Sequence, residues 1–195
     1  TIVSGYAGAT YDPDGLDGLP SLFNNTDDSI GYQFDNSLVV SDPRAVLAVG
    51  KGDTTDSDSG SASNVLFSAN NDSDSGDAIG SIRQVRDNHS QHQLTMYGYG
   101  SSYSDITDEA HVYWGRWDGT DVDGGYDKAV TEGPSTKAVA SQIQSPQSYI
   151  FTDTGSISRS YSGWGRHMML FKGVMSNTQL LAAIYFMTKK NLAAL

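Results

Sequence analysis

The sequence contains no cysteine, which excludes two ways of building a small secreted or metal-binding domain. Without thiols there is no disulfide framework and no thiolate metal centre, so redox chemistry does not indicate a cellular compartment. Long apolar runs are also missing. The longest, residues 180–187, is far shorter than the roughly 20 residues that span a bilayer. We therefore expect no membrane insertion.

Basic residues are scarce. The 12 Lys and Arg stand against 23 Asp and Glu, which gives a formal net charge of −11. A surface that binds phosphate needs positive charge, so this balance excludes nucleic acid and anionic membranes as partners.

Glutamate is nearly absent. Among the acidic residues, only Glu109 and Glu132 are Glu. The remaining acidic residues are Asp, whose short side chain bonds nearby backbone amides and favours turns, whereas Glu favours helices. Together with 21 Gly, this composition predicts a β protein rich in loops.

What is present is a series of short apolar or alternating segments separated by turn residues, which is typical of a β-sandwich. The segment 45–50 is wholly apolar and predicts a central strand. We expect the strands at 32–40, 45–50, 65–68, 79–85, 93–99, 111–117, 138–143, 149–151 and 166–171.

The length of 195 residues suits one well-filled core, and neither a repeat nor a linker divides the chain. We therefore expect a single domain, 1–195. Residues 1–35 are rich in Gly and Asp with little periodicity, and they suggest an extended N-terminal arm. Because the first residue is Thr1 rather than Met, we expect a processed or trimmed chain.

One helix is predicted, near the C-terminus. Ser176 and Gln179 have the spacing of a capping box. The apolar residues that follow, Leu180, Leu181, Ile184 and Met187, have helical spacing. Lys189 and Lys190 then lie near the negative end of the helix dipole.

The last third of the chain carries a resemblance to a known family. An aromatic strand runs into an Asp-Gly turn, in the order HVYWGRWDGT at 111–120, and a second Asp-Gly follows at 123–124. A strand and helix close the chain, in the order GWGRHMMLFKGVMSNTQL at 163–180. This order resembles the closing half of a concanavalin A-like jelly roll of the laminin-G-like type, as found in secreted adhesins and in phage and virion surface proteins.

The resemblance implies an all-β fold, namely an antiparallel β-sandwich with a concave face and one short C-terminal helix. Hydrolases of this architecture carry paired carboxyl groups on one strand, in the order Glu-x-Asp-x-Glu. Such a pair is needed on the two sides of a glycosidic bond. This chain has no such triplet, and Glu109 and Glu132 share no predicted strand. We therefore expect a non-catalytic member, not an enzyme.

Candidate ligand-binding residues are aromatic and acidic residues near predicted loops. Trp114 and Trp117 point to opposite faces of their strand, so one belongs to the core and the other is presented outward. We expect Trp117 to be the outward one, because it adjoins the Asp118-Gly119 turn. Trp164 lies between two glycines, which leave its ring unshielded on its own strand. Ordinary sandwich packing is the alternative for each Trp. The predicted ligand-binding set is Trp117, Asp118, Tyr97, Tyr99 and Trp164.

Two low-complexity loops suggest calcium as a cofactor, because hard cations take several Asp and carbonyl oxygens. The predicted metal ligands are Asp53, Asp56 and Asp58 in the first loop and Asp72, Asp74 and Asp77 in the second. Neither loop matches the EF-hand pattern, and solvated acidic loops are the alternative. Further Asp clusters occur at 12–17 and at 118–123.

Two functions fit these observations. The first is a non-catalytic surface recognition module that binds glycans or mediates adhesion. The second is a virion structural protein, a capsid decoration or tail-fibre component whose jelly roll docks on a larger assembly. Either implies an extracellular or virion-surface location and a glycan or protein surface as partner, and either is compatible with a homo-oligomer. A large exposed apolar patch favours the assembly component.

Overall fold

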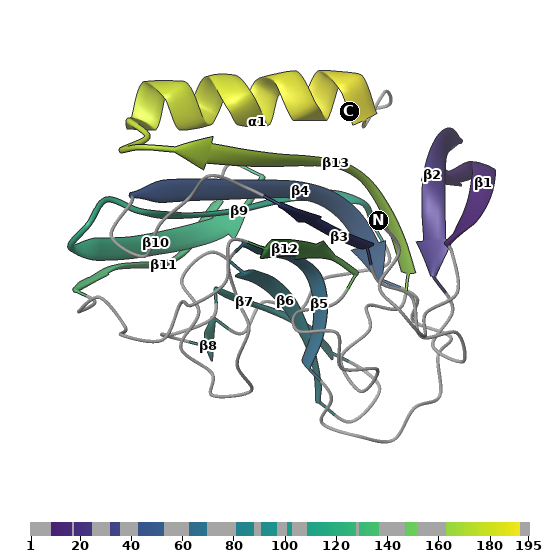
Figure 1. Cartoon of the computed structure of the whole chain (residues 1–195), viewed down its shortest axis with the longest axis horizontal. Helices are drawn as coiled ribbons and strands as arrows, with labels where there is room; N and C mark the ends of the chain where they lie inside the picture. Colours follow the sequence, from purple (N-terminus) through teal and green to yellow (C-terminus); the bar gives the residue numbers. More distant parts are fainter. Residues whose placement is uncertain are drawn as a thin grey trace.

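A computed structural model of the chain describes residues 9–16, 18–24, 32–35, 43–52, 63–69, 81–87, 91–96, 101–102, 109–127, 129–136, 147–151 and 163–191. In these residues two β-sheets are stacked, and one helix covers the outer face of the larger sheet (Figure 1). All strand pairs of the described residues are antiparallel. The predicted antiparallel β-sandwich with one C-terminal helix is therefore confirmed.

The larger sheet has seven strands, and its order differs from the chain order. From edge to edge the strands are β1 (Thr10–Leu16), β2 (Leu19–Asn24), β13 (Gly163–Lys172), β4 (Arg44–Gly52), β9 (His111–Trp117), β10 (Asp121–Tyr126) and β11 (Ala129–Thr136). The C-terminal strand β13 thus lies between strands from the first quarter of the chain. The three strands β9, β10 and β11 form a meander at the other side.

The smaller sheet has six strands. In order they are β3 (Tyr32–Asp35), β12 (Gln147–Ile150), β5 (Ser63–Ala69), β6 (Ser81–Asp87), β7 (Gln91–Met96) and β8 (Ser101–Ser102). The predicted strand at 138–143 lies outside the described residues.

The central strand β4 is buried on both faces, as its apolar sequence predicts. Val46 and Ala48 face the smaller sheet and pack with Leu66 and Phe67 of β5. The alternate residues of β4, Ala45, Leu47 and Val49, face the helix side. Because strand side chains alternate, one apolar run supplies both cores.

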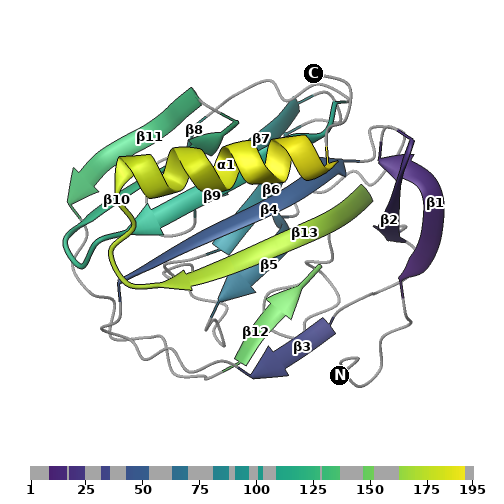
Figure 2. The same ribbon diagram turned by 90° about the horizontal axis from the view of Figure 1, so that it is seen from above.

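The helix α1 (Asn177–Asn191) begins where the capping box predicts. The Ser176 hydroxyl accepts the Gln179 backbone N–H at 3.3 Å, and the Gln179 side-chain oxygen accepts the Ser176 backbone N–H at 2.9 Å. The buried stripe of α1 consists of Leu180, Ile184 and Met187, which pack with Ala45, Leu47 and Val49 of β4. Figure 2 shows α1 lying across the seven-stranded sheet. Leu181 lies a quarter turn away from this stripe and is 52% exposed.

The expectation of an N-terminal arm is wrong for the part of residues 1–35 that the structure describes. β1 and β2 form a hairpin, β2 pairs with β13, and β3 pairs with β12 in the other sheet. Leu16 at the end of β1 is fully buried. The sequence did not reveal how this hairpin joins the sheet, because the second pairing partner of β2, the strand β13, lies about 140 residues later in the chain, where local periodicity gives no information.

Candidate functional site

The tight turn between β9 and β10 is held by one carboxylate. Asp118 Oδ1 accepts the backbone N–H groups of Thr120 and Asp121, both at 2.8 Å. Gly119, between Asp118 and Thr120, has a φ of 107°, a conformation that favours glycine. The backbone donors, that of Asp121 first, lower the pKa of Asp118 below its ordinary value. Asp118 is exposed and therefore stays ionised at neutral pH.

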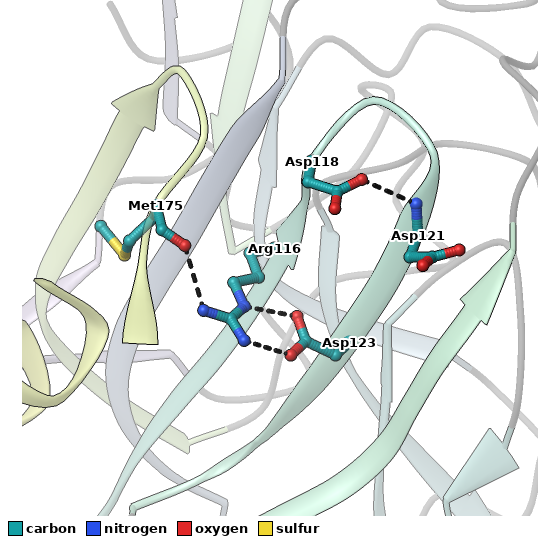
Figure 3. Close-up of polar contacts among 5 residues, drawn as sticks. All are labelled: Arg116, Asp118, Asp121, Asp123 and Met175. Carbon is teal, nitrogen blue, oxygen red and sulfur yellow. Dashed lines mark hydrogen bonds and ion pairs between the residues drawn. The ribbon is translucent and has the colours of Figure 1, made fainter. Parts of the chain in front are cut away.

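Below the turn, Arg116 joins three segments of the chain (Figure 3). Its Nε and Nη2 donate to the two carboxylate oxygens of Asp123 on β10, both at 2.6 Å. Its Nη1 donates to the backbone carbonyl oxygen of Met175, which precedes α1, at 3.0 Å. The hydrogen bond to Asp123 raises the pKa of Arg116 above its ordinary value, so the guanidinium is charged throughout. This fork fixes the start of α1 against the β9–β10 hairpin.

Between this hairpin and the start of α1 lies a pocket of about 690 Å³, here called the hairpin–helix pocket. Its polar lining includes Asp118 and Asp121 from the hairpin and Ser176 and Asn177 from the helix start. Its apolar lining consists of Trp114, Trp117, Val174, Met175, Leu180, Leu181 and Ile184. The pocket therefore offers short acidic acceptors beside an apolar wall.

Trp114 is the buried tryptophan beneath this pocket. Its side chain is on the helix side of β9 and is 2% exposed. Its indole Nε1 donates to the backbone carbonyl oxygen of Asp127 at 3.2 Å. With its polar atom bonded and its ring packed under α1, Trp114 serves as a rigid floor.

The expectation that Trp117 is presented outward is wrong. Trp117 is 1% exposed and packs in the core between the two sheets, with Val46 and Tyr113. The guanidinium carbon of Arg44 lies 5.8 Å from the centroid of its ring. The alternation of β9 was predicted correctly, but both faces of this strand are covered, one by the smaller sheet and the other by α1. The Trp117 ring is therefore not available for stacking on a ligand.

Trp164 is shielded, although not by its own strand. Its Nε1 donates to Asp12 Oδ2 at 2.9 Å, and its ring centroid is 4.7 Å from that of Phe23. Gly15 of β1 lies so close that a Cβ there would be 2.4 Å from the indole ring. The hairpin of β1 and β2 thus covers Trp164, whose ring the sequence predicted to be unshielded. Its role in ligand binding stays a prediction.

The structure brings together only part of the predicted set. Of the candidate ligand-binding residues, Trp117 and Asp118 line the hairpin–helix pocket. Trp164 lies at the opposite end of β4, since it pairs with Lys51 whereas Trp117 pairs with Arg44. Tyr97 and Tyr99 lie outside the described residues.

The six predicted calcium ligands, in 53–58 and 72–77, also lie outside the described residues, so calcium there stays a prediction. Within the described part of the chain, no three His, Asp or Glu side chains converge to hold a metal ion. At the hairpin, Asp123 is already paired with Arg116. The described residues also contain no helix that is long and apolar enough to cross a membrane.

Several residues of the site were not predicted from sequence, above all Arg116 and the 174–177 segment, and Asp123 was expected only as part of an Asp cluster and not as the partner of Arg116. The sequence did carry a signal for the contact between Arg116 and Asp123. If Asp118 and Asp121 close the turn, then Arg116 lies directly opposite Asp123, as the observed register shows. The contact to Met175 had no such signal, because it spans 59 residues.

No protein-family model matches the sequence, and no curated protein matches it. Solved structures do match. Domain 4 of AbnA, an extracellular GH43 arabinanase from Geobacillus stearothermophilus solved with arabinotriose, is 15% identical with a TM-score of 0.62, over 93% of this chain and 86% of that one. Trypanosoma rangeli sialidase in complex with sialic acid is 12% identical with a TM-score of 0.62, over 95% of this chain.

The chain spans only 29% of the length of that sialidase chain. At such low identities, the likeness shows the fold and nothing more. The protein therefore has the same β-sandwich fold as the arabinanase domain and as one part of the sialidase.

Proposed function

We propose that this chain is a non-catalytic recognition module that binds carbohydrate at the hairpin–helix pocket. The observation that carries the proposal is the lining of the pocket, in which Asp118 and Asp121 lie beside Val174 and Leu181. A sugar ring has hydroxyl groups that donate to carboxylates and C–H faces that pack on apolar surface. Both backbone bonds to Asp118 use Oδ1, which leaves Oδ2 able to accept a ligand hydroxyl.

Binding rather than cleavage is proposed because two of the three carboxylates that line the pocket are unsuited to act as a general acid. Glycoside hydrolysis needs one protonated carboxyl group with a raised pKa. The pKa of Asp118 is lowered instead, and Asp123 is held in a bidentate ion pair with Arg116. Glu109 precedes β9 and does not line the pocket.

The fold likeness supports the proposal, since the arabinanase domain was solved with arabinotriose and the sialidase with sialic acid. The resemblance of residues 109–195 to laminin-G-like jelly rolls points in the same direction. An extracellular or virion-surface setting is part of the proposal, and the extracellular arabinanase supports the former.

The test is a binding measurement with matched variants. Arabinotriose and sialic acid are the first probes by calorimetry, and a glycan array then extends the search. Asp121→Asn should weaken binding by about tenfold or more, because a hydrogen bond to a charged group contributes roughly 1.5–3 kcal/mol. Asp14→Asn, an exposed aspartate on β1, is the control and should leave affinity within about twofold.

Two results would overturn the proposal. One is a bound glycan whose affinity Asp121→Asn does not change, and the other is the absence of any glycan signal across the array. Release of product from a bound oligosaccharide would contradict the non-catalytic part alone.

The second candidate, a component of a larger assembly, is favoured by one observation. The outer surface of α1 exposes large apolar side chains, among them Tyr185 at 57% and Phe186 at 51%. A capsid decoration or tail-fibre protein would bury such a surface on its neighbours.

A further inference from the structure

The outer face of α1 is apolar where a solvent-facing helix is normally polar. Leu181 is 52% exposed, Tyr185 57% and Phe186 51%. Figures 1 and 2 show α1 lying across the outside of the seven-stranded sheet, with no other described element above it. Of these, Leu181 and Tyr185 are four residues apart and adjoin on the helix surface. Exposed apolar side chains that adjoin one another mark interaction surfaces more often than scattered ones do.

The charges on this face are separated along the helix. The helix sequence contains no acidic residue, although the chain has a net charge of −11. Its last turn carries Lys189 and Lys190. Its first turn adjoins the hairpin–helix pocket, where Asp118 and Asp121 provide negative charge. The outer face of α1 is therefore apolar in its middle and basic at its C-terminal end, and the carboxylates of the β9–β10 hairpin lie beside its N-terminal end.

This arrangement is complementary to itself when it is reversed. A two-fold axis brings the same patch of two copies together, so one end of the patch meets the opposite end of its copy. Residues four apart form a row along a helix, and Leu181, Tyr185 and Lys189 form such a row. With Tyr185 at the axis, Leu181 lies opposite Lys189 of the partner subunit.

We propose that α1 is the interface of a homodimer in which two copies of this helix pack antiparallel. Tyr185 and Phe186 form the apolar centre. Lys189 of the partner subunit lays its aliphatic stem over Leu181 and places its ammonium group by Asp121. The Lys189 Nζ is now 5.0 Å from the centroid of the Tyr185 ring, so the side chain already follows the helix surface. Long basic side chains commonly pack their stem on apolar surface in this way.

The contact is small. A helix of 15 residues is about 22 Å long, and only one of its faces takes part. Interfaces below the standard size of roughly 1,600 Å² tend to be weak or transient. We therefore expect a dimer that dissociates on dilution, with a dissociation constant on the order of micromolar.

The first experiment measures self-association by sedimentation velocity from about 1 μM to 1 mM, the range that brackets such a constant. The parent chain should shift from monomer to dimer across this series. Tyr185→Ser should raise the dimer dissociation constant about 30-fold or more, as expected for a central aromatic anchor. The matched control is Tyr11→Ser, since Tyr11 is 64% exposed on β1 and should leave the constant unchanged.

The second experiment uses charge exchange, and it does not depend on a variant that weakens the helix. Lys189→Glu and Asp121→Lys should each abolish self-association, because each places like charges together at both ends of the interface. An equimolar mixture of these two variants should form a heterodimer, because opposite charges then meet at both ends. Thermal melts confirm that every variant is folded.

A parent chain that stays monomeric at 1 mM, or a Tyr185→Ser chain that dimerises like the parent, would overturn the proposal. So would a failure of the two charge variants to form a heterodimer. Tyr185 and Phe186 do not line the hairpin–helix pocket, so the aromatic variants leave its lining intact. Leu181 and Asp121 do line it, so the partner subunit's Lys189 and a glycan compete for this end of the pocket. A Tyr185→Ser chain that loses dimerisation and still binds glycan therefore separates this inference from the proposed function.

Discussion

Replacing Arg116 by Met should loosen the start of α1 from the sheet and destabilise the fold. The substitution keeps a side chain of similar length but removes the two hydrogen bonds to Asp123 and the one to the Met175 carbonyl oxygen. It also leaves the Asp123 carboxylate without its counter-charge. The hydrogen bonds of the neighbouring Asp118 turn do not involve Arg116, so the turn itself should survive.

The expected magnitude follows from burial. The side chains of Arg116 and Asp123 are 19% and 16% exposed. Removing one partner of a fully buried ion pair costs roughly 3–5 kcal/mol, whereas fully exposed pairs contribute about 0.2–1 kcal/mol. We therefore expect Arg116→Met to lower the free energy of unfolding by about 2 kcal/mol. For a chain of this size, that corresponds to a fall in Tm of roughly 4–8 °C.

The assay is urea unfolding followed by tryptophan fluorescence, with Asp123→Asn and the double variant completing a cycle. The double variant should be less destabilised than the sum of the single variants, by about 1–2 kcal/mol. Arg116→Lys keeps the charge but not the planar fork, so it should be intermediate. An Arg116→Met chain within about 0.5 kcal/mol of the parent, or strictly additive single effects, would refute the reasoning.

Two further predictions concern a glycine and a turn carboxylate. Gly165→Ala should lower the free energy of unfolding by about 1–3 kcal/mol, because the added Cβ would lie 2.6 Å from the buried Phe151 ring; urea unfolding that shows equal stability would contradict this. The lowered pKa of Asp118 stabilises the fold above its ordinary value of 3.8, and this contribution is lost as the pH falls through the lower folded value. Stability measured from about pH 6 to pH 2 should therefore fall less steeply in Asp118→Asn than in the parent, and parallel curves would argue against it.

The features that the sequence predicted correctly are those encoded within a few neighbouring residues. The wholly apolar segment at 45–50 predicted a strand buried on both faces, and β4 is such a strand. The capping pair Ser176 and Gln179 predicted the first residue of α1 to within one position. In each case the physical cause is local: side-chain alternation in one, and hydrogen bonds across three residues in the other.

The features that were missed depend on which distant segment comes to lie alongside. Trp117 is buried because the smaller sheet packs on its face of β9, and nothing in the residues around it encodes that sheet. Residues 10–24 form an edge hairpin rather than an arm because β13, from the far end of the chain, supplies their neighbour.

The sequence by itself thus determined the class of fold, the single predicted helix and the acidic turn at Asp118, because hydrophobic periodicity and turn chemistry act over short distances. Only the tertiary structure decided that the Asp118 turn meets the start of α1, through the contact of Arg116 with Met175. It also decided which face of α1 is left for a partner, since Leu181 is exposed only because Leu180 and Ile184 already cover the sheet. Both outcomes depend on the order of strands in the sheet, which is fixed by packing between segments far apart in the chain.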